Sequence, residues 1–376
     1  MIKSVLKKCS VLVFIVRKAR AIKRIMLNKM NIKKINKLLS EGVIIHLMFN
    51  DKFLKPYVDF LNKYFNCKKH IVLCKRWFDK YPFPEGKNVF EIESFDCINL
   101  VNAKKIICHS VFDHEVIDRF YQERELLGKT CCVIWGGDFT NRSKEKRLHK
   151  DLFVLGNFYQ YVGGIDEPIV REMYNISDKQ IFFRNVNYIF PLNKTILDNV
   201  TCKNKGYIQI QLEQSAEISI LDSMDLLYKF KDENIKIVVI LSYGGDGVLE
   251  NEIIKKGCLL FGDKFEHIDN YMSPVNYAKH IVNNDILILN GDHQMAFGNT
   301  TAHLYLGKKV FVRSDIPTGK FLLDNYDIRV YSTESINALS FDEFITDHFS
   351  HSNKNNTLPF FDEEFIAKGW QKVFES

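Results

Sequence analysis

The chain has 376 residues, of which 46% are hydrophobic and 26% charged, and its formal net charge is +6. That length accommodates two α/β domains, and the composition is that of a soluble globular protein. The nine cysteines form no C-x-x-C pair and the eleven histidines no H-E-x-x-H motif. This pattern argues against a disulfide framework or a zinc site and favours reduced thiols in a cytoplasm.

Residues 1–40 carry many Lys and Arg but no Asp or Glu. The apolar run at 9–16, CSVLVFIV, is far shorter than the ~20 residues that a membrane-spanning helix needs. Basic residues follow it at once, and no small-residue cleavage site is present, so a signal peptide is not indicated. The basic residues alternate with Ile, Leu and Met, which predicts an amphipathic extension on an anionic membrane surface. A solvated extension without a partner is the alternative.

A first Rossmann-like domain is predicted over residues 41–195. The expected strands and helices of this domain are strands 43–48, 70–75, 105–109, 131–135 and 182–187, and helices 53–65, 115–127, 144–161 and 167–174. This alternation predicts a mostly parallel sheet with helices on both faces. The polar stretch 191–206 lacks periodicity and is the expected linker.

A second Rossmann-like domain is predicted over residues 206–345. Its expected strands are 207–212, 235–241, 258–261, 285–290 and 310–313. Helices are expected up to 230 and 256, from the Ser273-Pro274 cap, and from 299 to Gly307. The remaining segment, 346–376, carries apolar residues at helical spacing between 360 and 374, which predicts a helix that docks on another surface.

Two doubly wound domains in succession predict a central crevice lined by the carboxyl ends of their strands, where ligands of such sheets bind. The loops expected at this crevice are 49–52 and 136–140 from the first domain, and 213–219, 242–247 and 291–301 from the second.

Gly298, Asn299 and Thr300 follow a predicted strand and open a predicted helix. Unpaired backbone N–H groups and the helix dipole favour an anion at such a place, so these residues are candidates for binding a diphosphate. The simpler interpretation is that they turn the chain into a core helix. Four further crevice-loop residues are candidates for the donor site, namely Ser215, Tyr243, Gly244 and His293.

The motif Trp135-Gly136-Gly137-Asp138 follows a buried strand, so its carboxylate is expected at the crevice. A carboxylate there can act as general base on a hydroxyl, and Asp138 is the preferred candidate. An Asp in this position can equally cap the next helix. Asp51 and His46 are the alternative bases, and a strand-borne histidine is more often a core residue.

Ser242–Gly247, SYGGDG, has no Lys-Ser/Thr at its end, and no G-x-G-x-x-G follows the first strand. Both absences argue against a nucleotide triphosphatase and a dinucleotide dehydrogenase. The chain also lacks the D-x-D triplet that would supply paired oxygen ligands for Mg²⁺ or Mn²⁺. Backbone donors would then neutralise a leaving diphosphate, and neither a metal nor a cofactor is expected.

Five segments carry a resemblance to a known family. They are IIHLMFND at 44–51, VIWGGD at 133–138, VVILSYG at 238–244, AFGNTTAHLYLGKKVFV at 296–312 and FFDEEFIAKGWQ at 360–371. The chain resembles the bacterial TDP-N-acetylfucosamine:lipid II N-acetylfucosaminyltransferases, also called 4-alpha-L-fucosyltransferases or 4-acetamido-4,6-dideoxy-D-galactose transferases. The resemblance runs from about residue 43 to the C-terminus. It departs from the family at 211–215, QLEQS, where the family has a Gly/Ser/Asp-rich loop, and this affects the identity of the nucleotide sugar.

The resemblance implies an α/β GT-B fold, with two Rossmann-like domains about a crevice and a C-terminal helix packing back on the N-terminal domain. It implies an inverting, metal-independent glycosyltransferase that moves a deoxyamino sugar from a nucleotide diphosphate to a polyprenyl-diphosphate-linked saccharide. The expected place is peripheral, on the cytoplasmic face of the bacterial inner membrane, in the synthesis of enterobacterial common antigen or O-antigen, and no nucleic acid partner is expected. A transferase of another O-antigen or capsule sugar and a non-catalytic nucleotide-sugar-binding protein are the alternatives.

Overall fold

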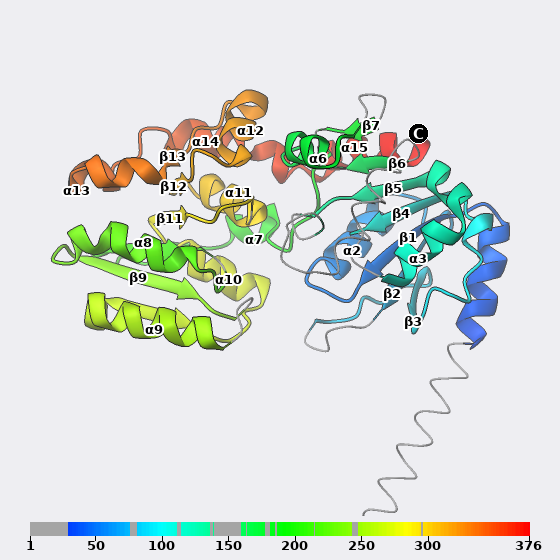
Figure 1. Ribbon diagram of the computed structural model, residues 1–376, viewed down its shortest axis with the longest axis horizontal. Helices are drawn as coiled ribbons and strands as arrows, with labels where there is room; N and C mark the ends of the chain where they lie inside the picture. The colour runs from blue at the N-terminus through cyan, green and yellow to red at the C-terminus, as the bar shows by residue number, and fades with distance from the viewer. Residues whose placement is uncertain are drawn as a thin grey trace, which may run out of the picture. The chain divides into compact units, whose positions relative to one another are not determined.

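The structure is a computed structural model (Figure 1). It describes residues 29–75, 81–110, 114–135, 138, 159–162, 164–176, 181–184, 186–213, 215–242, 247–294 and 296–376. The chain divides into two compact units. The first contains 1–162, 174–183 and 373–376, and the second contains 163–173 and 184–372.

The first unit contains a seven-stranded sheet in which every pairing is parallel, in the order β3-β2-β1-β4-β5-β6-β7. Its strands are β1 (Ile44–Phe49), β2 (His70–Lys75), β3 (Val89–Ile92), β4 (Lys105–His109), β5 (Thr130–Val133), β6 (Tyr159–Val162) and β7 (Ile181–Phe183). The main helices between them are α2 (Leu54–Tyr64) and α3 (His114–Gln122), and α6 (Glu167–Tyr174) follows β6. The strands β2 and β4 are buried from end to end and β1 is buried up to Phe49, which explains their nearly continuous apolar sequence.

The second unit contains a six-stranded parallel sheet in the order β10-β9-β8-β11-β12-β13. Its strands are β8 (Ile208–Leu212), β9 (Ile235–Ile240), β10 (Phe265–Ile268), β11 (Ile286–Leu289), β12 (Lys309–Val312) and β13 (Tyr331–Ser332). Its helices are α7 (Lys194–Asp198), α8 (Ser219–Leu227), α9 (Val248–Phe261), α10 (Pro274–Ile281), α11 (Phe297–Tyr305), α12 (Pro317–Tyr326), α13 (Phe341–Ile345), α14 (Ser350–Asn356) and α15 (Glu363–Glu375). The order of both sheets reverses next to the first strand, as in Rossmann-like folds. The prediction of two such domains is therefore confirmed.

One predicted strand is wrong, and one predicted helix overlaps a strand at its end. The strand expected at 258–261 is the end of helix α9, and the strand lies further on, at Phe265–Ile268. A short apolar run has no period that separates strand from helix, and Gly262, with φ +53°, ends the helix only after it. Of the helix expected at 144–161, the last three residues, 159–161, belong instead to strand β6, and 144–158 lie outside the described residues.

The end of the chain packs against both units separately. In the second unit, the buried indole of Trp370 donates to Asn187 O at 3.2 Å. In the first unit, Lys105 Nζ donates to Val373 O at 2.5 Å and to Ser376 O at 3.0 Å. The predicted C-terminal helix is therefore confirmed, and its last residues belong to the first unit.

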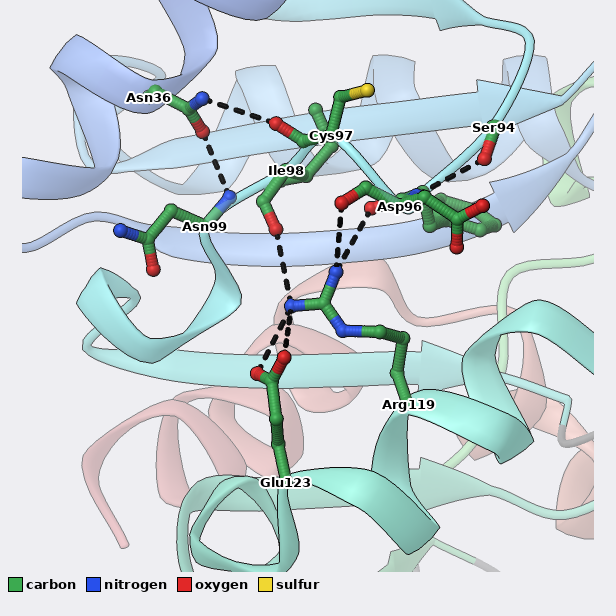
Figure 2. Close-up of polar contacts among 9 residues, drawn as sticks. Asn36, Ser94, Asp96, Cys97, Ile98, Asn99, Arg119 and Glu123 are labelled. Atoms are coloured by element: carbon green, nitrogen blue, oxygen red, sulfur yellow. Dashed lines mark hydrogen bonds and ion pairs between the residues drawn. The ribbon is translucent and has the colours of Figure 1, made fainter.

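Two helices, α3 and the helix at 29–40, hydrogen-bond to the loop 93–99 that follows β3 (Figure 2). The Arg119 guanidinium, on α3, donates to Asp96 O at 3.0 Å and Ile98 O at 3.4 Å, and it pairs with Glu123 at 2.8 Å. From the helical residues 29–40, the Asn36 amide donates to Cys97 O at 3.2 Å. The Arg119 contacts hold the loop to α3, and the Asn36 bond joins the helix at 29–40 to the same loop.

Among the residues that the structure describes, no helix is long and apolar enough to cross a membrane. Residues 29–40 are helical and bury Ile35 and Leu39 completely. Lys29, Lys33 and Lys37, spaced by four, are exposed. Residues at this spacing share one helix face, so a row of lysines faces solvent while the apolar residues pack inward.

Candidate functional site

Asp138 lies beyond the carboxyl end of β5 and is only 2% exposed. Its Oδ1 accepts a hydrogen bond from Ser110 Oγ at 2.6 Å, and its Oδ2 accepts one from Trp135 N at 2.8 Å. The carboxylate therefore folds back on the chain three residues before it and reaches across to the end of β4. A buried carboxylate with these partners is held in one orientation, as general-base chemistry requires.

Asp51 lies just beyond the carboxyl end of β1 and caps the following helix. Its Oδ1 accepts from Phe53 N at 2.8 Å and from Leu54 N at 3.1 Å. Burial raises the pKa of Asp51, and these two backbone N–H groups lower it in part. These bonds give a structural reason for an Asp at this position, whether or not it also acts in catalysis.

His46 is completely buried in the middle of β1. Its Nδ1 lies 3.2 Å from His109 Nε2 and its Nε2 lies 3.1 Å from His70 Nδ1. The Tyr57 hydroxyl lies 3.3 Å from His46 Nδ1, and the ring of Phe374 covers the cluster edge-on. Burial lowers the pKa of all three imidazoles, to about 4 for His70 and about 3 for His109, so they stay neutral. The structure places His46 in a core cluster, away from solvent.

Helix α11 begins at Phe297, with Ala296 before it at φ +62°, so it starts two residues before the predicted start at 299. The N–H groups of Asn299 and Thr300 both donate to Ala296 O, at 2.8 and 2.9 Å. Within the described part of the chain, the N–H groups of Phe297 and Gly298 have no acceptor. The open donors of this helix start are therefore those of Phe297 and Gly298.

Gly298 is required by packing. A Cβ built on it would lie 2.6 Å from the ring of Phe190, which is closer than carbon atoms approach. Its absent side chain thus makes room for an aromatic ring of the same unit. This packing reason is separate from the predicted role of Gly298 in binding a diphosphate through its backbone N–H.

Asn299 and Thr300 turn their side chains toward the protein. The Asn299 amide donates to Tyr277 Oη at 2.7 Å, and Thr300 is completely buried. Ser215 is also buried, with Oγ 3.5 Å from Glu217 Oε1. His293 Nδ1 lies 2.7 Å from Asp292 Oδ1. The other two donor-site candidates, Tyr243 and Gly244, lie outside the described residues.

A buried network of hydrogen bonds begins and ends at Asn299. Tyr277 Oη also lies 3.5 Å from Gln211 Nε2, and Gln211 Oε1 accepts from Asn284 Nδ2 at 2.7 Å. Asn284 Nδ2 lies 3.1 Å from His303 Nε2, and His303 Nδ1 lies 2.8 Å from Asn299 O. Both ends of the network thus meet at the first turn of α11. Nothing in the sequence pattern indicated it, because its members come from β8, α10, α11 and the chain before β11.

Glu213, at the end of β8, is the second feature that sequence reasoning missed. It is completely buried with φ +49°, and its Oε1 accepts from Asn290 N at 2.5 Å and Ser219 Oγ at 3.0 Å. Burial raises the pKa of Glu213 to about 7, although the Asn290 N–H and the Ser219 hydroxyl lower it in part. This carboxyl ties the ends of β8 and β11 together at the position where the chain departs from the family's glycine-rich loop.

No protein-family model and no curated protein matches the chain. Solved structures do match it. A glycosyltransferase from Rickettsia africae superposes with a TM-score of 0.62 at 12% identity, covering 89% of this chain and 98% of that one. Anabaena HepE in complex with UDP and glucose gives 0.61 at 10% identity, covering 89% and 100%. WaaG, a glycosyltransferase involved in lipopolysaccharide biosynthesis, gives 0.52 at 9%, covering 88% and 98%.

The chain has the GT-B fold. The predicted fold class is thereby confirmed, and each unit corresponds to one Rossmann-like domain of that fold. Identities near 10% establish a shared fold and no more, so they do not single out the N-acetylfucosaminyltransferase family.

Proposed function

We propose that this protein is an inverting, metal-independent glycosyltransferase. In this proposal it moves a deoxyamino sugar, such as 4-acetamido-4,6-dideoxygalactose, from a nucleotide diphosphate to a polyprenyl-diphosphate-linked saccharide of a bacterial surface polysaccharide. The second unit binds the donor, and the first unit deprotonates the acceptor. The fold supports the general class, because the similar solved structures include glycosyltransferases and a protein bound to UDP and glucose.

The observation that carries the proposal is the start of α11. Among the residues that the structure describes, the backbone N–H groups of Phe297 and Gly298 have no acceptor, and they lie at the N-terminus of a nine-residue helix that follows the carboxyl end of β11. The helix dipole and such open donors together favour a diphosphate at this position. They also supply the neutralisation that a leaving diphosphate needs if no divalent ion takes part.

On the first unit, Asp138 is the proposed general base. The acceptor hydroxyl attacks the anomeric carbon and loses its proton to the carboxylate, while the bond from that carbon to the diphosphate oxygen breaks. Attack from the face opposite the leaving group inverts the configuration. Asp51 is a weaker candidate because it caps α2, and His46 is weaker still because it is sealed in the core.

The test is a thermal-unfolding screen of nucleotide sugars, each with EDTA or with Mg²⁺. A ligand that binds only the folded state stabilises it by ~2.7 kcal/mol at 100 times its dissociation constant. We expect one nucleotide sugar to raise Tm equally in both buffers, and its nucleotide diphosphate to be released when a lipid-linked acceptor is added. Release that absolutely requires Mg²⁺ or Mn²⁺ would contradict the metal-free mechanism. Binding without any release would favour the non-catalytic binding protein.

A further inference from the structure

Ser110 directly follows the last residue of β4, and its backbone is left-handed, with φ +83°. A serine rarely adopts this conformation, because its Cβ crowds the backbone. In the described part of the first unit, the other non-glycine residue with positive φ is Asn175, and asparagine adopts that region readily. Strain of this kind persists where the surrounding structure imposes it, often at functional sites.

The strained backbone carries the Ser110 hydroxyl to the carboxylate of Asp138. The Ser110 N–H donates to Val133 O at 3.1 Å, which fixes the residue to the end of β5. Its Oγ then donates to Asp138 Oδ1 at 2.6 Å. Ser110 is half-buried, whereas Asp138 is 2% exposed. A hydroxyl group arriving from solvent therefore finds the serine more accessible than the carboxylate.

We propose that Ser110 is a further catalytic residue that relays the acceptor's proton to Asp138. This inference rests on the proposed transferase function. As the acceptor oxygen forms its bond to the anomeric carbon, its proton passes to Ser110 Oγ, and the proton of Ser110 passes to Asp138 Oδ1. The diphosphate leaves with the electron pair of the broken bond. Ser110 ends neutral and Asp138 ends protonated, ready to release the proton to water.

The alternative role of Ser110 is to hold Asp138 in place, and a glycine and an alanine variant first separate the effect of the hydroxyl from that of the strained backbone. Ser110→Gly removes the hydroxyl but suits φ +83°, so relief of the backbone strain should offset part of the stability lost with the hydrogen bond to Asp138. Ser110→Ala removes the hydroxyl and keeps the backbone strain. If the hydroxyl relays the proton, both variants should lose kcat by about 10²–10⁴-fold, the range of general acid–base assistance, with donor affinity unchanged.

Ser94 provides the matched control. It is also a half-buried serine of the first unit that donates to a carboxylate, Glu115 Oε2, at 2.9 Å. Ser94→Ala should therefore keep the kcat of the natural chain. A double variant, Ser110→Gly with Asp138→Asn, should be no slower than the slower single variant, because members of one relay are not additive.

Solvent deuterium distinguishes the relay from simple positioning. If two protons move in the rate-limiting step, a plot of kcat against the fraction of deuterium in the solvent is curved for the natural chain. A single proton transfer to Asp138 gives a straight line. A straight line, or a Ser110→Gly variant within twofold of the natural kcat, would overturn the relay while leaving the transferase in place. A natural chain that transfers no sugar from any donor would overturn the proposed function and the relay with it.

Discussion

At the scale of single residues, the proposed role of the first unit in catalysis depends on the carboxylate of Asp138. It is buried, and its two oxygens accept from different groups, Ser110 Oγ and Trp135 N. A residue that only capped a helix would accept from the N–H groups that follow it, as Asp51 does. Among the described residues, the bonds of Asp138 to Ser110 Oγ and Trp135 N point to the end of another strand and backwards along the chain.

We expect Asp138→Asn to lower kcat by about 10²–10⁴-fold, because the amide cannot take the acceptor's proton. Nucleotide affinity should not change, since the donor is proposed to bind the second unit. Steady-state kinetics with a titration of the nucleotide diphosphate measures both. Asp51→Asn is the control, because an asparagine caps a helix as well as an aspartate does. A loss of kcat in Asp51→Asn but not in Asp138→Asn would move the base to the end of β1.

A variant of Gly298 tests whether this position is a glycine because the Phe190 ring packs there or because a ligand binds there. Gly298→Ala should destabilise the protein by about 1–3 kcal/mol, because its Cβ would meet the Phe190 ring at 2.6 Å. Adding Phe190→Ala should relieve the collision, so that the pair is less destabilised than the two single changes predict. The double variant should still bind nucleotide. Denaturant unfolding and nucleotide titration of the four proteins check this, and lost binding in a folded double variant would show that the glycine serves the ligand.

At the scale of elements, helix α11 is positioned by polar bonds beneath its first turn. Asn299 contacts Tyr277 through its side chain and His303 through its carbonyl oxygen. Burial lowers the pKa of His303 to about 3, so the imidazole stays neutral and can act as both donor and acceptor in this network. The proposed diphosphate site is therefore fixed by residues that do not reach it.

Tyr277→Phe should weaken nucleotide binding. Without the hydroxyl, the Asn299 amide loses its 2.7 Å bond, and a buried polar group without a partner costs about 1–3 kcal/mol. If one or two kcal/mol of that loss falls on the conformation of the helix start that binds the diphosphate, the affinity for nucleotide should fall about 5–30-fold. Tyr305→Phe is the control, because it removes a tyrosine hydroxyl at the other end of α11, bonded to Asp198. Equal affinity losses in the two variants would show a general loss of stability.

At the scale of the whole molecule, buried histidines link stability to pH. Burial lowers the folded-state pKa of His70 to about 4 and of His109 to about 3, below the ~6.5 of the unfolded chain. The unfolded chain therefore binds protons first, and the stabilisation is full above about pH 6.5 and is lost as the pH falls. Asp166 and Glu213 act in the opposite direction, because burial raises the pKa of each to about 7.

A variant isolates the contribution of one histidine from these opposing groups. Each imidazole contributes about 1.4 kcal/mol per pH unit between pH 6 and 4.5. His70→Phe should make the fall in unfolding free energy shallower by about that slope. It should also be less stable at pH 7.5, because His46 loses its 3.1 Å partner. Urea unfolding across this pH range measures both, and parallel curves for the two proteins would contradict the assignment.

The basic N-terminal segment is predicted to bind an anionic membrane surface. Deleting residues 1–28 should reduce sedimentation with acidic liposomes, and Lys33→Glu with Lys37→Glu should reduce it further, because each basic residue near such a surface contributes about 1 kcal/mol. The deletion stops at 28 because Ile35, Leu39 and Asn36 belong to the packed first unit. Neutral liposomes and high salt are the controls. Unchanged binding in both variants would place any membrane contact elsewhere.

The sequence by itself determined the two domains, the parallel sheets and most strands. Buried parallel strands leave a nearly continuous apolar run, and helices an amphipathic period, so both are local signals that need no partner to be read. The strand at His70–Lys75 and the cap at Ser273 followed from such signals alone. The position of Asp138 after a buried strand was equally local.

Only the tertiary structure decided what surrounds those residues. Ser110 became a partner of Asp138 because β4 and β5 are neighbours in the sheet, and no spacing along the chain records that 28-residue separation. Gly298 faces Phe190, Glu213 reaches across to Asn290, and His46 is enclosed by two other histidines. These are contacts between segments far apart in sequence. Packing and burial set them, and packing and burial exist only once the sheet has formed.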